Sequence, residues 1–276
     1  MTKDNMTIRF TPDGFSFIDR PGASSSSLDD APFHEVTPGP DFQQRLHEAV
    51  LNVLPESETP LNLTVQILSE RVVILPPDTD PDLATSMYHA TLSDLDDPEQ
   101  VLLQPLVLPS GQHVTLCFGI DRQLYLFLER NCGDLRFEHH LAILLHQAAP
   151  SAAPSSSFPR PQDSTSPRPQ ASPSLRPQAS LSQPSMAAPS SPQSCLATLV
   201  TPQFLEIALF SADQLVLANI YRTSQADNRR YFVLNTWLRE GLDQLHDTLL
   251  ILGKGAPAAQ LHQDLRPFIK QINRNY

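Results

Sequence analysis

Residues 195–221 read CLATLVTPQFLEIALFSADQLVLANIY, which is three apolar runs separated by two short turns. The turns, Thr201-Pro202 and Ser211-Ala212-Asp213, consist of residues that favour chain reversal. Alternate side chains of a strand face opposite sides of its sheet. We therefore predict three consecutive strands over 195–200, 203–210 and 214–221. Within the middle strand, one set of side chains is expected on one face (Leu205, Ile207, Leu209) and the other set opposite (Phe204, Glu206, Ala208, Phe210).

Two helices and one strand are predicted after this meander. Apolar residues recur at helical spacing over 226–245, with one stripe and an adjacent tryptophan (Tyr231, Leu234, Leu238, Leu242; Trp237). A buried strand at 248–252 ends at Gly253-Lys254-Gly255, and a last helix over 257–272 is expected to kink at Pro267. The order strand, strand, strand, helix, strand, helix is typical of a ribonuclease-H-like unit.

The N-terminal half begins with a hairpin. Met6, Ile8 and Phe10 alternate with polar residues, and the turn Thr11-Pro12-Asp13-Gly14 precedes a second alternating run. Residues 23–28 are serine-rich and expected to be loose. Residues 121–131 fit either a strand or a helix, and a helix is preferred because Asp121 can cap it. The other predicted helices are 41–54 (capped by Asp41), 80–92 and 140–147, and the other strands are 62–68, 71–75, 101–107, 113–120 and 135–138.

A change of composition separates the two halves. Residues 150–194 hold 11 prolines and 14 serines, together with three Arg-Pro-Gln repeats (160–162, 168–170, 176–178). Such a segment buries too little to offset the entropy of ordering, so a disordered linker is predicted. A polyproline II ligand for a partner domain is the alternative. The predicted divisions are 1–149, a first ribonuclease-H-like lobe with inserted elements; 150–194, the linker; and 195–276, the second lobe.

Charge and cysteine content restrict the class of protein. The 276-residue chain has 19 basic and 30 acidic side chains, a formal charge of −11, which disfavours binding to nucleic acid or anionic lipid. No apolar run reaches the length of a membrane span, and the N-terminus lacks the pattern of a secretory signal. Three cysteines without a paired spacing indicate buried thiols in a reducing compartment, so a cytoplasmic location is expected.

Five stretches resemble an uncharacterised bacterial family. They are IRFTPDGFSF (8–17), VTLCF (114–118), LANIY (217–221), YFVL (231–234) and LLILG (249–253). Together they look like domain-of-unknown-function family 3822, which has the actin-like ATPase fold, a duplication of the ribonuclease-H-like unit. The resemblance implies an α/β protein of two such lobes with mixed sheets. It transfers no catalytic role, because the family's activity is itself unknown.

Active members of the actin-like superfamily hold phosphates at the hairpin turns of both units. Asp13 and Gly14 retain the residue types of the first turn, and Gly253 and Lys254 lie where a relative would contact adenosine. Under the alternative that the chain binds a nucleotide, these four residues are the candidate site for ATP with magnesium. The second turn, Thr201-Pro202-Gln203, has no carboxylate and no glycine, and proline removes one N–H donor. His139, His140 and His146 lack the spacing of a zinc site.

The sequence therefore favours a non-catalytic, actin-like-fold protein that acts as an interaction or scaffold module for an unidentified protein partner. No catalytic residue, metal or cofactor is predicted for it. The alternative is a nucleotide-binding ATPase or kinase-like enzyme that uses the cleft between the lobes. A third possibility is a hub that presents the Arg-Pro-Gln repeats to partner domains.

Overall fold

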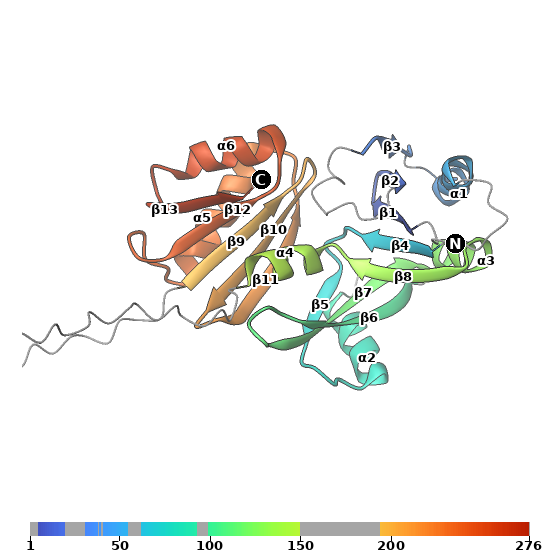
Figure 1. Ribbon diagram of the computed structural model, residues 1–276, viewed down its shortest axis with the longest axis horizontal. Helices are drawn as coiled ribbons and strands as arrows, with labels where there is room; N and C mark the ends of the chain where they lie inside the picture. Colours follow the sequence, from blue (N-terminus) through green and yellow to red (C-terminus); the bar gives the residue numbers. More distant parts are fainter. Residues whose placement is uncertain are drawn as a thin grey trace, which may run out of the picture.

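The structure is a computed structural model that describes residues 5–19, 31–37, 39, 41–54, 62–92, 99–149 and 194–275. The segment predicted to be loose, 23–28, lies outside the described residues, as does the predicted linker except for its last residue, Ser194. Figure 1 shows two lobes side by side, the first coloured blue to green and the second orange to red.

Each lobe contains a five-stranded sheet, and the two sheets have the same topology. The first has the order β3-β2-β1-β4-β8 and the second β11-β10-β9-β12-β13. In both, three strands form an antiparallel meander and two more run parallel to its first strand. The two-lobed fold predicted from the sequence is thereby confirmed. The strands are β1 (Asn5–Thr11), β2 (Gly14–Asp19), β3 (Phe33–Glu35), β4 (Asn62–Ile67), β8 (Asp134–His139), β9 (Ser194–Val200), β10 (Phe204–Ser211), β11 (Gln214–Arg222), β12 (Thr248–Leu252) and β13 (Gln271–Asn275).

The first lobe carries an inserted unit between β4 and α3. Its three strands form a separate antiparallel sheet of order β5-β7-β6, so the nearly continuous apolar strand β7 is central, as predicted. Helix α2 covers this sheet and buries Tyr88 against Cys117 and Leu75. The elements of the insert are β5 (Val72–Leu75), α2 (Pro81–Thr91), β6 (Glu99–Val107) and β7 (His113–Asp121).

The remaining helices are α1 (Phe42–Val53), α3 (Arg122–Asn131), α4 (Leu141–Ala148), α5 (Ala226–Arg239) and α6 (Gly255–Leu265). The helix preferred over a strand at 121–131 is confirmed, and Asp121 caps it by accepting the Leu124 N–H at 2.7 Å. Asp80 likewise caps α2. The cap predicted at Asp41 is wrong, because its side chain accepts no bond from α1, although the helix begins there.

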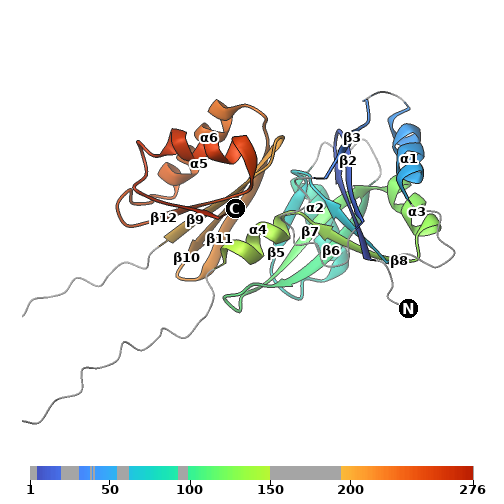
Figure 2. The ribbon, with the colours of Figure 1, turned by 45° about the horizontal axis from the view of Figure 1, so that its top comes forward.

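The second sheet is buried on both faces, and this explains the apolar run of β10. Leu205, Ile207 and Leu209 pack into a cluster with Trp237 of α5 and Leu261 of α6. The opposite face joins the core of the first lobe, where α4 contacts β9 and β10. Figure 2 shows α5 and α6 on one side of the sheet and α4 on the other. The faces predicted for β10 are therefore confirmed, and they fix how the lobes meet.

Helix α5 differs from its prediction in length and in orientation. It ends at Arg239, not Leu245, because Gly241 adopts a left-handed φ of 66° and donates to the Leu238 carbonyl. The predicted stripe is wrong: Tyr231 is 61% and Leu238 72% exposed, whereas Val233 and Trp237 are buried.

The last predicted helix is also wrong beyond its first half. Helix α6 ends at Leu265, and the N–H groups of Phe268 and Ile269 both donate to the Leu265 carbonyl. Proline cannot continue a helical hydrogen-bond ladder, so Pro267 ends the helix and does not kink it. The chain then forms β13, which pairs in parallel with β12 and completes the second five-stranded sheet.

Candidate binding site between the lobes

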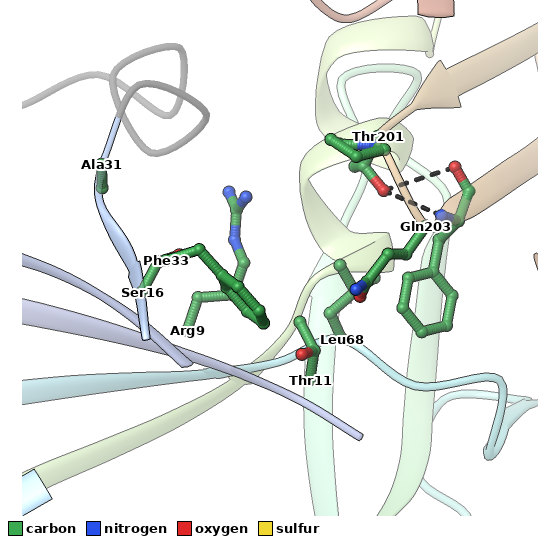
Figure 3. Close-up of a pocket in the computed structure, with 10 residues that line it drawn as sticks. Arg9, Thr11, Ser16, Ala31, Phe33, Leu68, Thr201 and Gln203 are labelled. Atoms are coloured by element: carbon green, nitrogen blue, oxygen red, sulfur yellow. Dashed lines mark hydrogen bonds between the residues drawn. The ribbon is translucent and has the colours of Figure 1, made fainter. Parts of the chain in front are cut away.

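A cavity of about 220 Å³ lies between the two lobes. Strands β1, β2 and β3 supply one wall, and the turn between β9 and β10 supplies the other. Figure 3 shows the side chain of Arg9 extending into the space that faces this turn. The polar residues of the lining are Arg9, Thr11, Ser16, Thr201 and Gln203, and its apolar residues include Phe33, Leu68 and Phe204.

A buried polar row forms the first-lobe wall. Arg9 of β1 lies directly opposite Ser16 of β2 and Gln66 of β4 in the sheet register. All three side chains are buried, and the Arg9 Nε donates to the Gln66 Oε1 at 3.4 Å. A guanidinium retains its charge in proteins, so it requires acceptors when it is buried. The row therefore places a positive charge at a cavity wall that has little water access.

The turn of the second lobe is satisfied by its own contacts. The Thr201 N–H donates to the Phe204 carbonyl at 3.0 Å, and the Phe204 N–H donates to the Thr201 Oγ1 at 3.0 Å. Arg229, which is also buried, donates to the carbonyls of Thr201 and Pro202 at 3.1 and 2.6 Å. Burial lowers the pKa of Arg229 from its ordinary value. The N–H groups of Thr201 and Phe204 are thus hydrogen-bonded within the turn, and Pro202 has no N–H that could bind a phosphate.

The turn of the first lobe is bound to the second lobe. The Arg222 Nη2 lies 2.5 Å from the Asp13 Oδ1, which joins the β1–β2 turn to the end of β11. Gly14 has a separate structural reason to be glycine, because a Cβ there would lie 2.1 Å from the His34 carbonyl oxygen. Neither Asp13 nor Gly14 lines the cavity.

Gly253 and Lys254 follow β12, as predicted. Gly253 has φ of 107°, and a Cβ at this position would approach the Val200 carbonyl oxygen to 2.5 Å. Lys254 immediately precedes α6. Neither residue lines the cavity. The four residues of the sequence-based nucleotide site therefore fall into two pairs, one at each of two separate turns, and the cavity is built from other side chains.

Sequence reasoning missed a buried polar contact between the lobes. The His140 Nδ1 lies 2.5 Å from the Glu206 Oε1, with both side chains almost completely buried. His140 immediately precedes α4, and Glu206 lies on the β10 face that α4 covers. The available signal was a single carboxylate inside an otherwise apolar strand, since buried charges are usually paired.

The other candidate groups are the cysteines and possible metal ligands. Cys117 is buried in the central strand β7, and burial raises the pKa of its thiol to about 11. The side chain is therefore held as the protonated thiol, which is less reactive than the thiolate. Among the described residues, no three His, Cys, Asp or Glu side chains gather closely enough to hold a metal ion. Within the same ranges, no helix has the length and apolar character required to cross a membrane.

The comparisons agree with this fold. Residues 178–272 match the family described as Protein of unknown function (DUF3822). A crystal structure from Bacteroides thetaiotaomicron VPI-5482, a protein with actin-like ATPase fold and unknown function, is 19% identical with a TM-score of 0.62; the alignment covers 99% of this chain and 91% of that one. No curated protein matches the chain.

Two other solved structures are more distant. A PilM–PilN type IV pilus biogenesis complex is 12% identical with a TM-score of 0.48, covering 99% of this chain and 88% of that one. An exopolyphosphatase from Cytophaga hutchinsonii ATCC 33406 is 8% identical with a TM-score of 0.34, covering 91% and 67%. The likeness to the Bacteroides protein shows the fold: this chain has an actin-like ATPase fold, and its resemblance to the family of unknown function is confirmed over residues 178–272.

Proposed function

We propose that this protein is a non-catalytic, actin-like-fold module that binds another protein. The observation that carries the proposal is the ion pair between Asp13 and Arg222. A carboxylate at the first hairpin turn is the group that would hold a magnesium ion beside the phosphates. In this chain that carboxylate instead joins the two lobes, and Arg222 would have to be displaced before Asp13 could serve a metal.

Two further features support the loss of nucleotide chemistry. In the second turn the N–H groups of Thr201 and Phe204 are hydrogen-bonded to each other's residues and Pro202 has no N–H, so few donors are left for a phosphate. The cavity between the lobes measures about 220 Å³, below the roughly 300–1,000 Å³ of ordinary small-molecule pockets. In this arrangement of the lobes the residues present therefore do not fit ATP with magnesium.

A nucleotide-binding ATPase or kinase-like enzyme remains the second candidate, because Arg9 lies buried at a cavity between the lobes. A fixed positive charge in a dry site favours an anionic ligand. Under this alternative, Asp13, Gly14, Gly253 and Lys254 contribute to the binding of ATP and magnesium after the lobes move apart.

Titration calorimetry with ATP and magnesium at millimolar concentration separates the two candidates. The proposed module gives no saturable heat. Micromolar affinity that disappears in both Asp13→Ala and Lys254→Ala would contradict it and support the enzyme. Arg45→Ala, which removes a charge from the exposed side of α1, is the matched control.

We also propose a cytoplasmic location. All three cysteines are free thiols, and burial raises the pKa of Cys117, Cys132 and Cys195. Free, protonated thiols are the state expected in a reducing compartment. Labelling of native cell extracts with a thiol reagent after denaturation tests this: all three cysteines should react without prior reduction.

A further inference from the structure

Two sheet edges face a common groove, which has a volume of about 710 Å³. One wall is β5, the edge strand of the inserted sheet, and the other is β11, the edge strand of the second lobe's sheet. Each edge strand presents backbone N–H and C=O groups that are not paired within its own sheet. The groove is thus bordered by strand edges from two different sheets.

The walls of the groove are mainly apolar. Val72 to Leu75 of β5 and Leu215 to Ile220 of β11 line it, and Val216 is 54% exposed. The β10–β11 register shifts beside Val216, so the regular part of the β11 edge begins at Leu217. An extended peptide that adds to the edge of β11 would place alternate side chains on the apolar residues of the groove.

The edge of β11 already forms one hydrogen bond with a group outside its sheet. The Leu215 N–H donates to the Gln112 Oε1 at 2.6 Å, and Gln112 belongs to the turn between β6 and β7. This contact closes one end of the groove and fixes the inserted unit against the second lobe. It also demonstrates that the backbone of β11 is accessible to acceptors on the insert side.

The charge of the surroundings specifies the partner. The described residues 70–92 and 99–121 contain six aspartates and glutamates and one basic residue, Arg71, which pairs with Glu99 at 3.1 Å. Glu70 is the one charged Asp, Glu, Lys or Arg side chain that lines the groove among the described residues, and it is exposed. Opposite charge on a ligand accelerates its association and selects against acidic segments.

We propose that the groove between β5 and β11 receives an extended, basic peptide segment of a partner protein as an added strand. The inference rests on the proposed function, which it deepens by giving the binding surface and the chemistry of the segment. The backbone of the segment pairs with the free edge of β11, its alternate side chains pack on apolar residues of the groove, and Glu70 attracts its basic residues.

Fluorescence anisotropy with three synthetic ten-residue peptides tests the proposal on the full chain. The first alternates valine and lysine, the second alternates valine and glutamate, and the third alternates proline and lysine. The third has the charge of the first but lacks half of its N–H donors. The valine–lysine peptide is expected to bind at least tenfold more tightly than either of the others. Equal binding of all three contradicts strand addition.

Two pairs of variants locate the site. Val216→Lys and Glu70→Lys place positive charge in the groove and should each weaken the valine–lysine peptide at least tenfold. Val107→Lys, at a residue 56% exposed on β6, and Glu48→Lys, on the exposed side of α1, are the matched controls and should change the affinity less than twofold. Equal effects of the groove and control variants overturn the proposal.

The outcomes also separate this proposal from the proposed function. Magnesium ATP is titrated into the same protein: saturable binding contradicts the non-catalytic module, whereas failure of all peptides without ATP binding contradicts only the groove. Sedimentation distinguishes another occupant, because a dimer that dissociates in Val216→Lys would mean that a second copy of this chain fills the groove and not a basic partner.

Discussion

The His140 Nδ1 and the Glu206 Oε1 lie 2.5 Å apart, within hydrogen-bond distance, in a buried contact between the lobes. His140 comes from the first lobe and Glu206 from the second, and water reaches neither. Because each group is the other's main compensation for burial, the relative position of the lobes is tied to the integrity of this pair.

Loss of one member of this pair should be strongly destabilising. We expect Glu206→Leu to lower the free energy of unfolding by about 3–5 kcal/mol, because it leaves His140 buried without its partner. The double variant His140→Leu/Glu206→Leu should lose less than the sum of the two single variants. Urea unfolding of all three measures the coupling. Asp227→Asn, in an exposed pair with Arg230, is the control, and a loss in Glu206→Leu no greater than in this control would contradict the prediction.

Glycine should be required at position 253 because the backbone there packs closely against the backbone of Val200. In Gly253→Ala the new Cβ meets the Val200 carbonyl at 2.5 Å and the residue must keep a φ of 107°. We expect a loss of more than about 1–2 kcal/mol, since the left-handed conformation alone accounts for that amount. At Gly111, φ is 84° and no atom lies within 4 Å of the added Cβ. Gly111→Ala therefore measures the cost of the left-handed backbone conformation without a steric contact.

Thermal unfolding of the two alanine variants provides the comparison. The Gly253→Ala variant should melt at a clearly lower temperature than Gly111→Ala. Equal midpoints would mean that the approach to Val200 has no energetic importance, and a role of Gly253 in ligand binding would then be the better reason for glycine.

The two faces of α5 should differ sharply in their tolerance to substitution. Trp237 is 1% exposed and packs on the second sheet, so Trp237→Ala should lower the free energy of unfolding by about 3–5 kcal/mol. Leu238 is 72% exposed, and Leu238→Ala should have little effect. The helical pattern in the sequence places Leu238 on the apolar stripe and therefore predicts a large loss of stability for Leu238→Ala. Urea unfolding that finds Leu238→Ala as damaging as Trp237→Ala would restore the sequence-based orientation.

Local patterns were sufficient for most elements of this fold. The alternation in β1 and the three runs at 195–221 predict strands because burial on a sheet has a period of two residues. The cap at Asp121 predicts a helix start because a side-chain acceptor satisfies an otherwise free N–H. These signals act within a few residues, so a single sequence contains them in full.

The failures occurred where the partner lies far away in the chain. The buried face of α5 is set by the distant strands β9, β10 and β12, and a helix with apolar residues on several sides cannot reveal which side they cover. Likewise, β13 forms because β12 offers a parallel edge, a fact absent from residues 266–275. The pair of His140 and Glu206 joins residues 66 positions apart, and only the meeting of the lobes creates it.

The last prediction concerns acid sensitivity, which His139 should produce. This side chain is fully buried, and burial together with the neighbouring His140 lowers its pKa to about 3. Its Nδ1 accepts the Leu141 N–H at 3.2 Å, which only the neutral ring can do. In the unfolded chain the pKa returns to about 6.5. Between these values the unfolded chain binds a proton that the folded protein excludes.

The free energy of unfolding should therefore be fully retained above about pH 6.5 and fall as the pH decreases toward 3. His139 alone should account for a loss of about 1.4 kcal/mol between pH 7.5 and pH 5.5. Burial also lowers the pKa of His47, which acts in the same direction. Urea midpoints at both pH values for the wild type and for His139→Gln isolate the contribution of His139: the variant should be less stable at pH 7.5 but lose about 1.4 kcal/mol less on acidification. If both proteins lose the same amount, another group carries the acid sensitivity and His139 titrates normally in the folded state.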